Sequence, residues 1–342
     1  MVCVRKSVAL SLMRLERSLR EIDSIKSVRD VAIVDWSMGT TCNYECSYCP
    51  EPLHDGKQPW PTEDKWWRIL DTMHKHFQRP IQYILSGGEP TVMPHFDKFL
   101  QAIKKHNPKN LVSIITNGSR TTRWWEKYGE LIDTVNLSVH LEQCNPAHLL
   151  DVCHTYYKPG WNELNVLIAI TPEQWDKGIE AAELLASASN GYSVSLKRMR
   201  IEFGSQTYPY DEYQEYILQK YALFNTYDPN WMYPLRKPKR IALEHRIHYK
   251  DGTDEFLNAN NNINQNNNVF TGMKCYIGID KIFINQFREI TAGSWCPQGN
   301  WAHPDKIGRL EDLDNLKWPT QPYICEQPRC MNATDMRTRK HW

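Results

Sequence analysis

Three cysteines stand close together near the start of the chain, and their spacing could place three thiolates around one metal centre. Cys42, Cys46 and Cys49 have three and two residues between them, and they follow Gly39, where the preceding apolar run ends. Thiolate ligands select zinc, copper(I) or iron–sulfur clusters. A structural zinc site needs a fourth ligand nearby, for which His54 is available. A [4Fe–4S] cube held by three cysteines instead keeps one iron open, and the loop alone leaves both possibilities.

A glycine turn supplies a second candidate for ligand binding. The sequence SGGEP, residues 86–90, directly follows an apolar run at 81–85 that predicts a strand. Two adjacent glycines could let the backbone approach a ligand closely. The carboxylate of Glu89 suits a cationic amino group, because charge-assisted hydrogen bonds are the strong ones.

The two motifs together resemble the radical S-adenosylmethionine (SAM) enzymes, whose last cysteine follows an aromatic residue, here Tyr48. The resemblance implies that Cys42, Cys46 and Cys49 hold a [4Fe–4S] cluster whose open iron binds SAM. Such enzymes cleave SAM reductively into methionine and a 5′-deoxyadenosyl radical, which abstracts hydrogen from the substrate. The cofactors do this chemistry, and the protein orients them. A flavodoxin- or ferredoxin-type electron donor is implied as well.

The resemblance also predicts which residues contact SAM, with Tyr48 near the adenine, the turn at the methionine end, and strand-end residues at the ribose and carboxylate. The predicted contacts are Tyr48, Gly87, Gly88, Glu89, Pro90, Thr116, Asn117 and Ser138. The last three could equally be ordinary turn or strand-end residues. His140 and Glu142, beyond the end of the same strand, could face the substrate or be solvent-exposed loop residues. Some of the charged residues of the last strand could bind an anionic group on SAM or on the substrate: Lys197, Arg198, Arg200 and Glu202. No catalytic residue is assigned.

A second set of cysteines lies near the C-terminus. Cys275, Cys296, Cys325 and Cys330 frame an alternating apolar segment at 276–284 that predicts a β-hairpin. The set resembles the Twitch appendage of radical SAM enzymes, a shortened relative of the SPASM domain, which holds an auxiliary [4Fe–4S] cluster. The final Cys-x4-Cys spacing departs from the usual Cys-x2-Cys. A zinc site with four thiolates and unpaired buried thiols remain alternatives.

Predicted strands and helices alternate six times between residues 31 and 205, which indicates right-handed βαβ units and a parallel sheet. Six units fall short of the eight that close a full barrel, and the resemblance likewise implies a partial (βα)6 TIM-like barrel. Ligands bind at the carboxyl ends of such strands, where the motifs fall. The expected strands are 31–38, 81–85, 111–116, 134–140, 164–170 and 192–202, and the expected helices are 63–77, 94–105, 122–131, 145–156 and 172–188.

Three further regions flank the predicted barrel. Residues 1–30 form an expected N-terminal helical segment, since an apolar helical stripe runs from 7 to 25. Residues 206–270 are expected to be a helical and linker region, with a helix at 211–224 and a solvated, mobile Asn-rich loop at 258–268. Residues 271–342 are expected to form the Twitch/SPASM-like auxiliary-cluster domain.

Composition narrows the class of protein. Forty-one basic and forty acidic residues nearly balance, so no nucleic-acid partner is expected. No apolar run approaches the roughly 20 residues of a membrane span. Charged residues also interrupt the N-terminal apolar segment, so no signal peptide is expected and the chain is expected to be cytoplasmic. In a cytoplasmic protein, ten cysteines indicate metal ligands or reactive thiols rather than disulfides.

We expect an oxidation of a small-molecule or peptide substrate, assisted by the second cluster. The absence of an evident leader-binding segment before residue 31 slightly disfavours a maturase of ribosomal peptides. Alternatives are a redox-neutral radical modification, such as an epimerisation or a rearrangement, and a non-enzymatic zinc or iron–sulfur protein.

Overall fold

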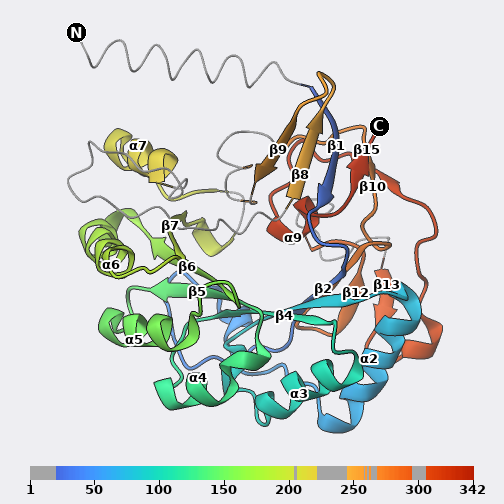
Figure 1. Ribbon diagram of the computed structural model, residues 1–342, viewed down its shortest axis with the longest axis horizontal. Helices are drawn as coiled ribbons and strands as arrows, with labels where there is room; N and C mark the ends of the chain where they lie inside the picture. The colour runs from blue at the N-terminus through green and yellow to red at the C-terminus, as the bar shows by residue number, and fades with distance from the viewer. Residues whose placement is uncertain are drawn as a thin grey trace.

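Six parallel strands form the centre of the structure (Figure 1). The computed structural model describes residues 21–203, 206–221, 245–257, 259, 262, 268–294 and 306–342. Consecutive strands are neighbours in the sheet, and every pair is parallel. The strands are β2 (Ala32–Ser37), β3 (Ile81–Ser86), β4 (Leu111–Thr116), β5 (Thr134–His140), β6 (Glu163–Ile170) and β7 (Ser193–Arg198).

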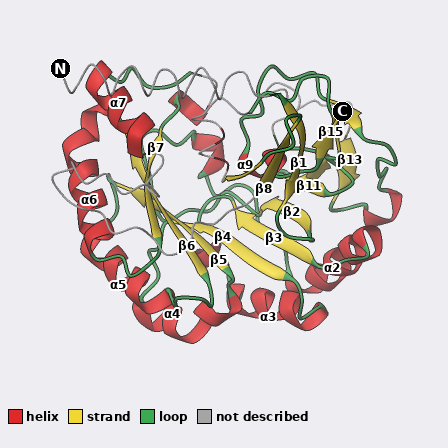
Figure 2. Cartoon of the chain, turned by 45° about the horizontal axis from the view of Figure 1, so that its top comes forward, coloured by secondary structure: helices red, strands yellow, loops and turns green. Residues whose placement is uncertain are grey.

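Helices cover the outer face of this sheet (Figure 2). They are α2 (Glu63–Phe77), α3 (Phe96–His106), α4 (Thr122–Tyr128), α5 (Pro146–Tyr156), α6 (Trp175–Ser187) and α7 (Glu212–Tyr221). Short 3-10 turns occur at Glu51–Leu53, Pro90–Val92, Gly129–Leu131, Pro172–Gln174, Ile201–Phe203 and Leu313–Asn315. No helix in the described part is long and apolar enough to cross a membrane.

The main core lies between the sheet and the helices. Strand side chains alternate, so Val34 and Trp36 of β2 join the core, while Asp35 points to the barrel interior. Trp36 meets Phe99 of α3 edge to face, with ring centroids 5.7 Å apart. The order and the parallel register confirm the predicted partial (βα)6 barrel.

The C-terminal part of the chain extends the barrel sheet. β11 (Lys281–Ile284) pairs in parallel with β2, and β12 (Glu289–Thr291) returns antiparallel beside it. β13 (Lys306–Arg309) then pairs with β12 and completes nine strands. The expected hairpin is therefore present, and its first strand adjoins the strand that leads into the cysteine loop.

A second sheet joins segments from far apart in the sequence. Its order is β14-β10-β15-β1-β8-β9, and all its pairs are antiparallel. The strands are β1 (Ile22–Ser27), β8 (His245–Tyr249), β9 (Asp254–Leu257), β10 (Lys274–Cys275), β14 (Tyr323–Ile324) and β15 (Lys340–His341). The short helix α9 (Ala333–Met336) precedes β15. The sheet therefore ties the N-terminal strand to the chain end.

The predicted helix at 7–25 is wrong where it can be compared. Residues 7–20 lie outside the described residues, but Ile22 and Ile25 belong to strand β1. The pairing of β1 with β8 shifts its register between Ile22 and Ser24, and both isoleucines contact the same core. Such a bulge lets residues three apart share a face of the strand. The apolar residues of β1 therefore have the spacing that normally indicates a helix.

Two other boundaries are corrected. The expected strand 192–202 ends at Arg198, and the expected linker between 206 and 270 includes the β8–β9 hairpin. Within the Asn-rich stretch, Asn262 and Asn268 are buried rather than solvated. Asn268 donates its side-chain amide to the carbonyl of Cys330, with 3.2 Å between the atoms. The other asparagines of 258–267 lie outside the described residues.

A buried lysine joins the C-terminal region to the barrel. Lys281 is fully buried, and its Nζ lies 3.6 Å from Oδ2 of Asp35 and contacts Asp335. Ser294 and Thr334 also donate to Asp35, at 2.9 and 2.5 Å. Two buried carboxylates are tolerated here because the ammonium and the hydroxyls satisfy them.

Lys281→Met should destabilise the fold by about 3–5 kcal/mol, since it removes the buried ammonium that Asp35 and Asp335 share. Denaturant unfolding of the full chain measures this loss. The matched control is Lys306→Met on β13, which removes a half-exposed ion pair with Glu289 of β12 and should cost about 0–1 kcal/mol. Equal stability of both variants would contradict a structural role for the buried ammonium.

Candidate functional site

The cysteine loop begins where β2 ends, at the carboxyl edge of the barrel. Met38 N donates to Ser86 O at 2.8 Å, so the loop leaves the sheet beside β3. Cys49 N donates to Cys46 O at 3.0 Å, which turns the chain back between these two cysteines. Cys46 is buried, and Cys42 and Cys49 are half-buried. The loop therefore presents three partly enclosed thiols.

Burial governs the ionisation of these thiols. Burial, with smaller contributions from neighbouring cysteines, raises the pKa of Cys46 to about 12 and that of Cys49 to about 11. The pKa of Cys42 is raised by burial and by the charge of Glu89. Thiolate ligands must lose these protons when a metal centre binds. Cys42 raises the pKa of both other thiols, and Cys49 raises that of Cys46, as ionisable groups that lie near one another do.

The glycine turn packs directly against the cysteine loop. Gly87 and Gly88 have φ angles of 91° and 51°, which favour glycine. A Cβ on Gly88 would lie 2.1 Å from the carbonyl oxygen of Thr41. Glu89 N donates to the same carbonyl at 2.9 Å. The glycines are therefore required by the packing of the turn against the cysteine loop. The sequence suggests a different reason, namely that they let the backbone approach a ligand closely.

The carboxylate of Glu89 is buried at the ends of β3 and β4, with 1% of its surface exposed. Its Oε1 accepts from Thr91 N at 3.0 Å, Thr91 Oγ1 at 2.6 Å and Thr116 Oγ1 at 2.7 Å. Its Oε2 accepts from Asn117 N at 2.7 Å. Burial raises the pKa of Glu89, and these hydrogen bonds oppose the rise. Oε2 retains acceptor capacity for an amino group.

Hydrogen bonds between asparagine side chains connect the end of β4 to the cysteine loop. Asn117 donates its side-chain amide to Oδ1 of Asn43 at 3.0 Å, and Asn43 donates in turn to Ser119 Oγ at 3.0 Å. Asn43 directly follows Cys42. The end of β4 therefore positions the first cysteine as well as Glu89, and Asn117 is a structural contact whether or not it meets SAM.

The end of β5 holds the other half of the loop. Tyr48 is buried, and its hydroxyl lies 2.7 Å from Nδ1 of His140, with the two rings stacked. Burial lowers the pKa of His140 to about 4, so the ring is neutral, and its tautomer sets which of the two groups donates the hydrogen bond. Glu142 accepts from both N and Oγ of Ser47, each at 2.6 Å. From the sequence, His140 and Glu142 are candidates for substrate contact. In the structure they support the cysteine loop, and only their position at a strand end could have indicated this supporting role.

The inner face of the barrel is polar and open near these strand ends. Ile115 is 39% exposed although β4 is a central strand. Ser138 lies on the same face of β5 as His140, which is paired across Ala169 with Lys197 of β7. Lys197 is exposed, and within the described residues it forms no hydrogen bond or ion pair.

The C-terminal cysteines gather on the second sheet, apart from Cys296, which lies outside the described residues. β10 and β14 pair so that Cys275 faces Tyr323, and Cys325 follows one residue after β14. Cys275 and Cys330 are buried, and Cys325 is half-buried. Burial raises the pKa of Cys330 to about 12, and both other cysteines contribute while Lys340 opposes them. Three of the four expected ligands are therefore neighbours.

The donor set of the N-terminal loop suits a cluster held at three corners. Among the described side chains, no group of three or more His, Cys, Asp or Glu is arranged around a single metal ion. His54, the candidate fourth ligand for zinc, bonds through Nδ1 to Pro50 O at 3.1 Å. Three soft thiols on one loop, beside a turn with spare acceptor capacity, match the chemistry of an iron–sulfur centre.

Comparison with known proteins places this architecture in a family. The radical SAM superfamily model matches residues 36–182. GTP 3′,8-cyclase of Cronobacter sakazakii (strain ATCC BAA-894) is 24% identical over 157 residues, which cover 43% of this chain and 44% of that protein. An S-adenosylmethionine-dependent nucleotide dehydratase of a Thermoplasmatales archaeon (strain ISO4-H5) is 29% identical over 99 residues, covering 29% and 34%. The chain thus spans less than half the length of these relatives.

Solved structures agree on the fold. The structure of anSMEcpe with bound AdoMet superposes with a TM-score of 0.52 at 14% identity, covering 82% of this chain and 78% of that chain. A structure of anSMEcpe with AdoMet and the Cp18Cys peptide gives the same values. Residues 36–182 therefore match the radical SAM superfamily in sequence, and the likeness to these structures is one of fold. The family implies SAM and a [4Fe–4S] cluster, and it confirms the resemblance read from the two motifs.

Glu89→Gln should weaken SAM binding by about tenfold or more while leaving the iron content unchanged, since charge-assisted hydrogen bonds contribute about 1.5–3 kcal/mol. A glutamine amide would also face one of the hydrogen-bond donors that the carboxylate now accepts. Anaerobic titration calorimetry with SAM measures the change. Glu51→Gln, at an exposed residue just after the cysteine loop, is the matched control. Unchanged affinity in Glu89→Gln would refute the assignment.

Proposed function

We propose that this chain is a radical SAM enzyme. Cys42, Cys46 and Cys49 hold the SAM-binding [4Fe–4S] cluster, and the substrate lies in the open barrel interior. The observation that carries the proposal is the direct contact between the two motifs, in which Glu89 N and Thr41 O are 2.9 Å apart. When bound, the cluster and SAM supply a 5′-deoxyadenosyl radical that abstracts hydrogen from the substrate.

Residues around the loop would orient SAM. The backbone of Gly87 to Pro90 and the free acceptor capacity of Glu89 would receive the methionine end. Thr116, Asn117 and Ser138 stand at the ends of β4 and β5, where the ribose and carboxylate are expected. Tyr48 would lie at the adenine, held in place by its hydrogen bond to His140. The enclosure of this region would exclude water from a reactive radical.

The substrate would carry an anionic group. Lys197 lies on the inner face of β7, and β6 separates this strand from β5, which carries His140. The charge of Lys197 lowers the pKa of His140. An exposed ammonium with no acidic partner among the described residues is available to bind an anionic group. Two relatives are named for GTP and nucleotide chemistry, and anSMEcpe was solved with a peptide. A small molecule and a peptide with a carboxylate or phosphate both satisfy this requirement.

A second [4Fe–4S] cluster would be held by Cys275, Cys296, Cys325 and Cys330. Support comes from the grouping of three of these thiols, and from the buried ammonium of Lys340, whose charge favours their ionised forms. With four thiolates, no iron stays open to the substrate. Such a cluster would accept an electron from the substrate radical, so we favour an oxidation over a redox-neutral rearrangement. A flavodoxin- or ferredoxin-type donor would reduce the first cluster.

Iron analysis of the anaerobically purified chain tests both sites together. The wild type should carry about eight irons, and a variant with Ala at Cys42, Cys46 and Cys49 about four, if both sites are thiolate cubanes. The triple variant retains every C-terminal cysteine and so serves as its own control for that site. One tightly held zinc and no iron in the triple variant would show a structural zinc site, and the argument for oxidation would fall.

Lys197→Ala should weaken the binding of an anionic probe by about tenfold, because it removes one charge-assisted contact. GTP is the probe, titrated into the SAM-saturated protein, and SAM affinity is measured separately. Lys197→Arg should restore most of the GTP binding, while Lys98→Ala, on an outer helix, should change neither. Loss of SAM affinity with unchanged GTP affinity would assign Lys197 to the SAM carboxylate instead.

A further inference from the structure

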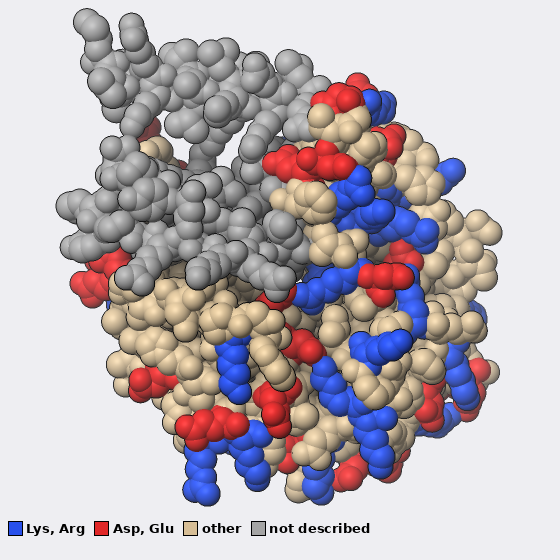
Figure 3. Space-filling model, in the orientation of Figure 1, with Lys and Arg blue, Asp and Glu red and all other residues tan. Residues whose placement is uncertain are grey.

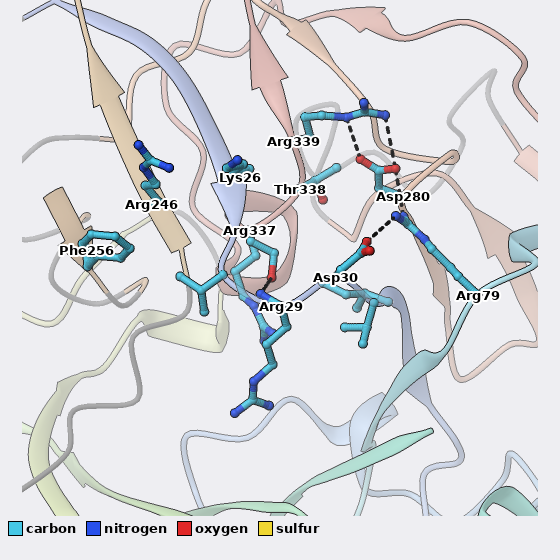
Figure 4. A pocket seen from close by; sticks show the side chains of 14 residues that line it. Lys26, Arg29, Asp30, Arg79, Arg246, Phe256, Asp280, Arg337, Thr338 and Arg339 are labelled. Carbon is cyan, nitrogen blue, oxygen red and sulfur yellow. Dashed lines mark hydrogen bonds and ion pairs between the residues drawn. The ribbon is translucent and has the colours of Figure 1, made fainter. Parts of the chain in front are cut away.

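A basic pocket opens where the second sheet meets the first residues of the barrel strands (Figure 4). Its volume is about 510 Å³. It lies beside the starts of β2 and β3, whereas the cysteine loop and the glycine turn follow the ends of these strands. Six basic side chains line it against two acidic ones: Lys26, Arg29, Arg79, Arg246, Arg337 and Arg339, with Asp30 and Asp280. Basic side chains gather on this face of the molecule, as Figure 3 shows.

One wall is a row of three residues across neighbouring strands. Lys26 of β1 is paired directly with Arg246 of β8, which is paired with Phe256 of β9. Like charges directly opposite each other destabilise a sheet. Arg246 donates to Asp254 at 2.7 Å, but Lys26 has no hydrogen bond or ion pair within the described part of the chain. An anion between the two cations would remove the repulsion.

Arginines fixed by their own partners form the remaining wall. Arg79 and Arg339 both bond to Asp280, at 2.9 and 3.1 Å, as Figure 4 shows. Arg29 contacts Glu163 on β6, and Arg337 donates to the neutral Gln82 at 2.7 Å. Side chains that are already ordered lose little entropy when they bind a ligand. Their guanidinium groups match the geometry of phosphate oxygens.

We propose that this pocket binds a small phosphate-bearing molecule with an aromatic ring, such as a nucleotide. Its phosphates would lie between Lys26, Arg29 and Arg246, and its ring against Phe256, which is 47% exposed. Pockets for small molecules commonly measure about 300–1,000 Å³, so the volume suits such a ligand. The pocket is separate from the SAM and substrate sites proposed above, because it adjoins the opposite ends of the strands.

Titration calorimetry on the full, cluster-loaded and SAM-saturated chain tests the proposal with ADP, inorganic pyrophosphate and adenosine. ADP and pyrophosphate should bind, and adenosine should not. Lys26→Ala should weaken both phosphate ligands by about tenfold. Phe256→Ala should weaken ADP alone, because pyrophosphate has no ring. Lys250→Ala, at the end of the same β8 hairpin and outside the pocket, is the matched control and should change neither.

Three results would overturn the proposal. Adenosine binding as tightly as ADP would show that phosphate is not recognised. Equal losses in Lys26→Ala and Lys250→Ala would indicate a general effect of surface charge. ADP binding that Lys197→Ala removes and Lys26→Ala leaves intact would place the nucleotide in the barrel. If neither phosphate ligand binds, the basic surface fits an acidic macromolecule better, and the small-molecule site is rejected.

Discussion

The geometry of the site depends on one buried carboxylate. Glu89 forms no ion pair with a basic side chain within the described residues, so hydrogen bonds must offset the cost of its burial. Thr91, Thr116 and Asn117 supply them, and this requirement fixes the ends of β3 and β4 relative to each other. The backbone N–H of Glu89 donates to the carbonyl of Thr41, so the position of Glu89 also fixes the start of the cysteine loop. The turn and the cysteines therefore behave as one unit.

The strand that delivers the cysteines is supported on both sides. β3 pairs with one edge of β2, and β11 pairs with the other edge. The contact between Lys281 and Asp335 then connects β11 to the helix before β15, beside the C-terminal cysteines. The long stretch between residues 203 and 274 contributes no strand to the barrel sheet among its described residues.

The barrel could be predicted because each element carries its own periodic signal, and because cysteine spacing and a glycine turn are local patterns. The contacts that hold the site could not. The bond from Tyr48 to His140 spans 92 residues, and the sequence gives no sign of it beyond a strand end. The bulge in β1 gives this strand the apolar spacing of a helix, so the sequence predicts the wrong element. Asn262 and Asn268 are buried by contacts with residues distant in the chain. The roles of the cysteines and of the SAM contacts remain predictions.

Cleavage of SAM is the most direct test of this account. The reduced wild-type protein, incubated anaerobically with dithionite and SAM, should release 5′-deoxyadenosine and methionine even without its substrate. The variant with Ala at Cys42, Cys46 and Cys49 should release neither, because no ligand would remain for the SAM-binding cluster. Undiminished 5′-deoxyadenosine formation by that variant would contradict the assignment of these cysteines. A wild type that carries its irons but never cleaves SAM would contradict the proposed function.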